Sequence, residues 1–288
     1  MIYGFIDLHT HGIDRFDTRT SSPEEILRIA ELHGQKGVAA ILPTIYPAPV
    51  EEMRRNMEAV RKAIEMQKSG LGQATILGLY LEGPFLNPLR CGALNKESFL
   101  RPNISSLKRL IEGYEGIIKI ITIAPEIPGA LRLIERCGEM GIRVNMGHSD
   151  ATYKEALNGK KAGATGITHI FNAMRPFHHR EPGIAGLGLM DKDLYIEVIA
   201  DGLHISREVL RLIYTLKRPD RIITISDSIK GAGKKTGTYR SSERVLKGGL
   251  LDLSESAKIL KEIGFPDHLI QKTLIENPYR YLEMGLQV

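Results

Sequence analysis

The amino-acid sequence predicts an α/β protein that folds as one (β/α)8 TIM barrel, and two observations point to this fold. Eight short apolar runs, rich in β-branched residues, recur along the 288 residues, and such strands are typical of a parallel sheet buried on both faces. Helical patterns separate the runs, as a barrel requires. The predicted strands span residues 3–8, 38–42, 75–81, 117–123, 142–146, 166–169, 195–200 and 221–226.

The helical segments carry recognisable end signals. The first, over residues 21–37, opens with a serine cap, Pro23 and two acidic residues in its first turn. Glycine closes several helices before the next strand, as at Gly37, Gly141 and Gly163, because glycine tolerates the left-handed turn that is needed there. An open doubly wound sheet is the alternative fold. It would need fewer strands or a clearer switch point, the place where the order of the strands reverses. Residues 230–249 are predicted to form a loop after the eighth strand.

Length and composition limit the class of protein. A barrel of this kind takes roughly 250 residues, so we expect residues 1–288 to form a single catalytic domain, with no separate β-sandwich domain. A chain that is 42% hydrophobic and 25% charged is typical of a globular protein. Its net charge of +5 is scattered rather than gathered with aromatic residues into one face, so no nucleic-acid partner is expected.

The cysteines and the apolar pattern indicate the compartment. Cys91 and Cys137 are too few and too far apart to form a disulfide framework or a zinc motif, which favours a reducing cytoplasm. No stretch reaches the roughly 18 uninterrupted apolar residues of a membrane span, and the N-terminus lacks a basic signal region. We therefore expect a cytoplasmic protein without a membrane partner.

Polar residues gather where the predicted strands end. In a (β/α)8 barrel these ends open on one face, so residues that are distant in sequence converge on one pocket. Buried carboxylates repel one another unless a cation or a proton neutralises them, which predicts a divalent metal site. The residues at these ends are Asp7, His9, His11, Glu82, His148, His169, Asp201, His204 and Asp227.

His9 and His11 flank Thr10 at the end of the first strand. Residues two apart in a strand point to the same side, so both imidazoles can reach one cation.

Several motifs resemble those of the amidohydrolase superfamily and, within it, of the N-acetylglucosamine-6-phosphate deacetylase family. The resemblance covers most of the chain, and three motifs are specific to the deacetylase branch: LEGPF, HIFNAM and HREPG. The matching segments are FIDLHTHG (5–12), LEGPFLNP (81–88), GHSDAT (147–152), THIFNAM (168–174), HHREPG (178–183), IADGLH (199–204) and SDS (226–228).

The resemblance implies a barrel of the metal-dependent hydrolase type, with Glu82, His148 and His169 as metal ligands. His9 and His11 match a pair that holds a second metal in some members, so one or two divalent ions are expected per chain. Zn²⁺ is the first choice, with Fe, Mn or Co as alternatives. Asp227 matches the catalytic acid and base, which takes a proton from water and returns it to the departing amine.

The resemblance also implies a substrate site and a partner. His204 matches a residue that contacts the sugar or its acyl carbonyl. Asn172 and Ala173 offer backbone N–H groups to a phosphate. Arg180 offers a planar guanidinium group that is suited to bind an oxyanion. His178 and His179 stay ambiguous, because one could contact substrate while the other faces solvent. The expected partner is a small-molecule amino-sugar phosphate, and a homodimer is expected.

Two departures from the family pattern stand out. Leu94 occupies the position, twelve residues after Glu82, where the family usually has a histidine that polarises the acetyl carbonyl. Leucine cannot donate a hydrogen bond, and loss of such a donor costs on the order of 10²- to 10³-fold in rate. We expect the small β-sandwich domain that family members usually carry to be missing.

Three functions therefore stay open. The first is metal-dependent deacetylation of N-acetylglucosamine 6-phosphate to glucosamine 6-phosphate and acetate, which makes the protein a hydrolase of a linear amide. The second is an amidohydrolase that acts on another amide or a cyclic amide, as Leu94 suggests. The third is a barrel that binds sugar phosphate or metal without catalysis, although a binding protein has little use for an acid and base such as Asp227 beside a metal.

Overall fold

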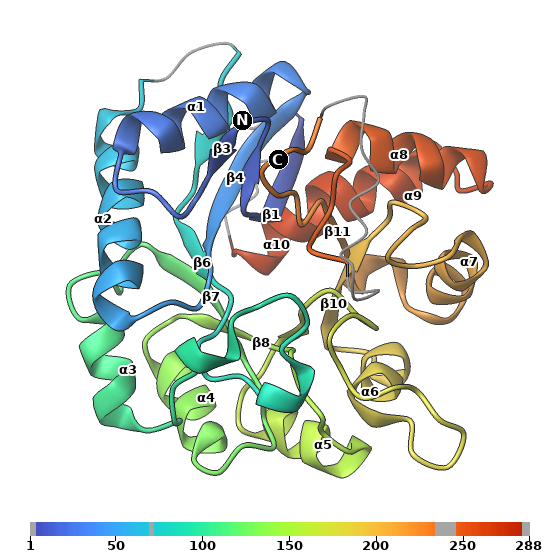
Figure 1. Cartoon of the computed structure of the whole chain (residues 1–288). Coiled ribbons are helices and arrows are strands. Elements are labelled where there is room, and N and C mark those ends of the chain that lie inside the picture. The colour runs from blue at the N-terminus through green and yellow to red at the C-terminus, as the bar shows by residue number, and fades with distance from the viewer. Residues whose placement is uncertain (1–3, 69–71, 234–245, 284–288) are drawn as a thin grey trace.

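The computed structural model describes residues 4–68, 72–233 and 246–283. Its parallel sheet curves into a nearly closed barrel with helices around it, which confirms the predicted (β/α)8 fold (Figure 1). Neighbouring strands follow one another in chain order. The barrel strands are β1 (Phe5–Thr10), β4 (Val38–Ile45), β6 (Leu79–Leu81), β7 (Ile118–Ile123), β8 (Arg143–Met146), β9 (Gly166–Ile167), β10 (Tyr195–Ile199) and β11 (Ile222–Ile225).

The helices lie outside the strands, and the first begins within the segment that the sequence predicts. Ser22 caps the first helix, where its side chain accepts from the Glu25 N–H. The α-helices are α1 (Pro23–Gln35), α2 (Val50–Met66), α3 (Ile104–Ile111), α4 (Ala130–Glu139), α5 (Tyr153–Lys161), α6 (Gly183–Met190), α7 (Arg207–Leu216), α8 (Leu253–Glu262), α9 (Asp267–Gln271) and α10 (Asn277–Tyr281). Short 3-10 turns η1 (Pro88–Arg90), η2 (Lys96–Ser98) and η3 (Pro219–Arg221) and a π-helical turn η4 (Lys272–Glu276) complete these elements. None of the helices within the described ranges is long and apolar enough to cross a membrane.

The predicted third strand, residues 75–81, is divided in two. Its first part, β5 (Thr75–Ile76), pairs with β4 beside the barrel path, whereas β6 pairs with β4 and β7. Gly78 lies at the break with a φ of +147°, and a Cβ there would lie 2.4 Å from the Ile117 carbonyl oxygen. Only glycine fits this close approach.

The first and last barrel strands meet at their carboxyl ends. The Asp227 N–H donates to the His9 carbonyl at 2.9 Å, and the His11 N–H donates to the Ser228 carbonyl at 2.7 Å. A small hairpin of β2 (Gly12–Ile13) and β3 (Phe16–Asp17) follows β1. Of the predicted loop 230–249, residues 234–245 lie outside the described ranges.

Two apolar layers support this arrangement. The larger layer packs the helices against the outer faces of the strands. The smaller one fills the barrel interior with side chains from β1, β4, β6, β7, β10 and β11, among them Leu8, Tyr80 and Ile225. The pairing of β1 with β4 shifts register between Asp7 and Thr10. This irregularity lets His9, which directly follows Leu8, face the interior as well.

Candidate metal centre and active site

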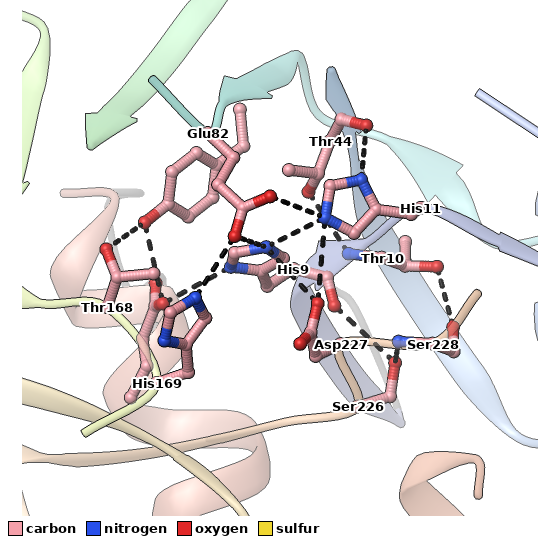
Figure 2. Close-up of polar contacts among 12 residues, drawn as sticks. His9, Thr10, His11, Thr44, Glu82, Thr168, His169, Ser226, Asp227 and Ser228 are labelled. Carbon is pink, nitrogen blue, oxygen red and sulfur yellow. Dashed lines mark hydrogen bonds and ion pairs between the residues drawn. The ribbon is translucent and has the colours of Figure 1, made fainter. Parts of the chain in front are cut away.

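Six titratable side chains meet at the carboxyl ends of the barrel strands. They form two neighbouring groups of three, each with its ligating atoms within 4.8 Å of one another. Figure 2 shows most of them, with side chains from β1 facing those that follow β6, β9 and β11. Residues that are distant in sequence therefore share one cluster, as predicted. The groups are Glu82, His148 and His169, and His9, His11 and Asp227.

The first group centres on the Glu82 carboxylate. Its Oε1 lies 3.0 Å from His148 Nε2 and 3.1 Å from His169 Nε2. Each of the three residues is only 3% exposed. One carboxylate and two imidazoles at this spacing leave room for a water or a substrate atom on a shared cation, which is the usual pattern of a catalytic metal site.

The second group lies beside the first. His9 Nε2 is 3.2 Å from His11 Nε2 and 3.4 Å from Asp227 Oδ1. Glu82 connects the two groups, because its Oε2 lies 3.1 Å from His11 Nε2. A carboxylate in this position can contact a cation in either group.

The charge states of these residues fit a cation. Burial lowers the pKa of His9 well below its usual value, so this imidazole is neutral. Burial alone would raise the pKa of Glu82, but the charge of His11 and hydrogen bonds from His11, His148 and His169 hold it well below its usual value. Neutral imidazole and ionised carboxylate are the forms that bind divalent metals.

Three residues of the cluster have left-handed backbones. The φ angles are +47° at His148, +26° at His169 and +48° at Asp227. This conformation is uncommon for residues other than glycine, and such strain gathers at functional sites. Each of the three residues is the second one after the end of its strand, where the turn directs the side chain into the cluster.

Hydrogen bonds on the far side of the rings orient the imidazoles. His148 Nδ1 lies 2.9 Å from the Arg90 carbonyl oxygen, and His11 Nδ1 lies 3.0 Å from that of Thr44. A donor bond from Nδ1 leaves Nε2 with a free lone pair, which is the form that binds a metal. The rings are therefore held ready to bind a cation.

Asp227 has the properties of an acid and base. Burial, together with the negative charge of Glu82, raises the pKa of its carboxyl group to about 7. A carboxyl group with such a pKa can both accept and release a proton near neutral pH. A cation beside it would lower this pKa and favour the accepting form.

A cavity of about 220 Å³ opens onto the cluster. His204, Asn172 and Ala173 line it, and their contact with substrate stays a prediction. His204 Nδ1 lies 2.7 Å from Asp201 Oδ2, which fixes the orientation of the ring. The Asn172 N–H donates to the His169 carbonyl at 3.0 Å, so the Ala173 N–H is the remaining candidate of the predicted phosphate cradle.

The structure does not bring Arg180 and His179 into this cavity. Both are exposed on a turn where His178 pairs with Glu181, and Arg180 Nη1 lies 3.4 Å from His179 Nε2. Their predicted contact with substrate stays a prediction.

Leu94 does line the cavity, so the departure from the family pattern faces the cluster. The sequence reasoning missed three further residues. Tyr46 stacks on His11 with ring centroids 3.7 Å apart, and Lys247 also lines the cavity. Tyr46 follows the end of β4 directly. The strand-end rule, that polar residues at the ends of barrel strands converge on one pocket, could therefore have found it. The third is Glu197, a lone acidic residue within an apolar strand.

Fold and site together define the class: this is a (β/α)8 barrel of the amidohydrolase type, with two groups of side chains that could hold a divalent metal ion. No family model matches the chain. The chain is 32% identical over 276 residues to the N-acetylglucosamine-6-phosphate deacetylase of Bacillus subtilis, covering 91% of this chain and 70% of that protein. The chain belongs to the N-acetylglucosamine-6-phosphate deacetylase family.

Two further proteins agree with this assignment. The N-acetylgalactosamine-6-phosphate deacetylase of Escherichia coli is 34% identical over 249 residues, which cover 86% of this chain and 65% of that protein. The chain thus spans about two thirds of the length of both relatives. A solved structure of a mutant N-acetyl-D-glucosamine-6-phosphate deacetylase from Mycobacterium smegmatis, in complex with N-acetyl-D-glucosamine-6-phosphate, has a TM-score of 0.89 and 29% identity, covering 98% of this chain and 77% of that one.

Proposed function

We propose that this chain is a metal-dependent hydrolase that removes the acetyl group from an N-acetylated amino-sugar 6-phosphate. N-Acetylglucosamine 6-phosphate is the first candidate, giving glucosamine 6-phosphate and acetate. The observation that carries the proposal is the position of Asp227 beside the Glu82, His148 and His169 group, in a cavity that His204 also lines. The names of the relatives supply the substrate class.

The residues divide the work of amide hydrolysis between them. Glu82, His148 and His169 would hold a divalent cation, which supplies a Lewis acid for the amide carbonyl and lowers the pKa of water. Asp227 takes the proton from the attacking water and then delivers it to the amide nitrogen as the C–N bond breaks. His204, oriented by Asp201, can hydrogen-bond to the sugar or to the acyl oxygen.

Acetate release tests this proposal. The purified chain would be freed of metal and then loaded separately with Zn²⁺, Mn²⁺, Fe²⁺ or Co²⁺. N-Acetylglucosamine 6-phosphate, N-acetylgalactosamine 6-phosphate and unphosphorylated N-acetylglucosamine would be compared as substrates. We expect turnover of a phosphorylated sugar with at least one metal, Zn²⁺ first, and a kcat lower by roughly 10²- to 10⁴-fold in Asp227→Asn. Absence of turnover in the folded, metal-loaded chain would refute the proposal.

Leu94 favours a second candidate, an amidohydrolase that acts on another amide or a cyclic amide. The side chain faces the cavity where a hydrogen-bond donor to an acetyl carbonyl would be useful. Comparing phosphorylated with unphosphorylated amides separates the two candidates. A deacetylase of the sugar phosphate should prefer the phosphorylated substrate, whereas an enzyme for another amide should show no such preference.

We also propose that the chain forms a homodimer and works in the cytoplasm. An apolar groove of about 520 Å³ runs between α6 and α7, with Phe177, Met190 and Leu216 each more than half exposed along it. Apolar patches of this kind favour association. Cys91 and Cys137 are free thiols, in keeping with a reducing compartment. Light scattering during size-exclusion chromatography tests the dimer.

A further inference from the structure

Glu197 is a buried carboxyl group in the barrel interior to which the mechanism above assigns no role. It lies within β10 between Ile196 and Val198 and is 1% exposed. Burying a carboxyl group is costly unless specific partners hold it. The identity of those partners therefore indicates what the group does.

Two of its partners hold the carboxyl group in place. Asn145 Nδ2 donates to Glu197 Oε1 at 2.8 Å, and the Tyr80 hydroxyl lies 3.5 Å from Oε2. These contacts come from β8 and β6, on other sides of the barrel. They fix one oxygen firmly and direct the other, Oε2, toward the metal residues.

The third partner is His9. Glu197 Oε2 lies 3.4 Å from His9 Nδ1, while Nε2 of the same ring faces His11 and Asp227. When Nδ1–H donates to Glu197, Nε2 keeps its lone pair and points it at the centre of the second ligand group. The opposite tautomer would place a proton there and block a cation.

This contact is specific to one of the two ligand groups. His11 and His148 are oriented by backbone carbonyls, whereas His9 is oriented by a carboxyl side chain from another strand. Among the described residues, Glu197 bonds none of the side chains of Glu82, His148 or His169, although the backbone N–H of His169 donates to its carboxyl group. Removing the carboxyl group should thus weaken the second group more than the first.

We propose that Glu197 is a positioning residue that fixes the tautomer of His9 and thereby allows a second divalent cation to bind at His9, His11 and Asp227, beside a first one at Glu82, His148 and His169. The inference rests on the metal site of the proposed function but not on its substrate. Counting bound metal tests it without any assay of turnover, so the two proposals can fail separately.

The experiment compares three variants with the parent chain. Metal-free proteins are titrated with Zn²⁺, and bound zinc is counted by elemental analysis after desalting. The parent should bind two ions per chain. Glu197→Ala should weaken the second ion more than the first, by roughly 10- to 100-fold in affinity. Glu197→Gln should lie between Glu197→Ala and the parent, because its amide oxygen can still accept from Nδ1–H.

Thr122→Val is the matched control. It removes a buried hydroxyl that bonds Tyr80 and Thr168 in the same interior network and leaves the Glu197–His9 contact in place. It should keep both ions. Thermal unfolding of the metal-free proteins shows whether each variant folds.

A spectroscopic readout separates positioning from a merely structural role. The ¹⁵N shifts of labelled histidines in the metal-free protein distinguish the two tautomers, with His9→Gln used to assign the signal. The parent should show His9 protonated at Nδ1, and Glu197→Ala should lose this preference. The proposal is overturned if the parent binds one ion, if Glu197→Ala binds two with unchanged affinity, or if it loses both ions equally.

Discussion

The Nε2 atoms of His9 and His11 lie 3.2 Å apart, and both face the carboxylates of Glu82 and Asp227. Two neutral imidazoles can form a hydrogen bond through these atoms only if one Nε2 carries a proton and donates it, which leaves that nitrogen without a free lone pair. A cation placed between them would satisfy both nitrogens and the carboxylates at once. The arrangement is therefore better suited to an ion than to an isolated hydrogen-bond network.

The first prediction concerns the metal. Glu82→Gln removes the charge that both ligand groups share, so we expect both cations to bind more weakly and acetate release to fall by at least about 10²-fold. Elemental analysis and turnover would be measured on the same samples. Glu58→Gln, which removes a carboxylate on α2 that pairs with Arg61 away from the cluster, serves as the control. Equal zinc content in Glu82→Gln and the parent would contradict the prediction.

The second prediction concerns Asp227. Asp227→Asn cannot accept the proton of the attacking water, so kcat should fall by roughly 10²- to 10⁴-fold. The ion at Glu82, His148 and His169 should remain bound, which elemental analysis can verify. A variant that retains full activity would show that another group acts as the base.

The third prediction concerns pH. Activity should fall on the acid side as Asp227 becomes protonated. Its pKa is raised to about 7 in the metal-free chain, and a bound cation lowers it because it favours the carboxylate. The acid limb of the kcat/KM profile should therefore lie below pH 7. A limb centred above pH 7 would not fit this assignment.

The fourth prediction concerns Leu94. Leu94→His places a hydrogen-bond donor on the cavity wall, so we expect kcat for N-acetylglucosamine 6-phosphate to rise by up to about 10²-fold. Leu94→Met, which adds no donor, is the control. An equal rise in both variants would mean that shape matters at this position rather than the donor.

The fifth prediction concerns stability. Burial lowers the pKa of His33 to about 4, whereas an unfolded chain protonates histidine near its usual value of about 6.5. The unfolded state binds more protons between these values. Stability is thus full above about pH 6.5 and falls toward pH 4, by on the order of 3 kcal/mol. Urea unfolding of metal-free His33→Gln should show a flatter pH dependence than the parent.

Much of the fold could be predicted because the barrel strands are uniformly apolar. The break at Gly78 could not, because it depends on how closely one strand approaches Ile117. The strand-end rule located both ligand groups, since parallel strands in a barrel open on one face. It could not find Glu197, which lies inside β10, nor show that Arg180 does not line the cavity.

The contact between the His9 carbonyl and the Asp227 N–H places the second ligand group at the junction of the first and last barrel strands. An ion held there would link the first barrel strand to the last, although the two strands are far apart in the sequence. Binding favours the native state by mass action. The bound cation should thus stabilise the closed barrel. Its removal by a chelator should lower the melting temperature of the protein, which can be measured without substrate.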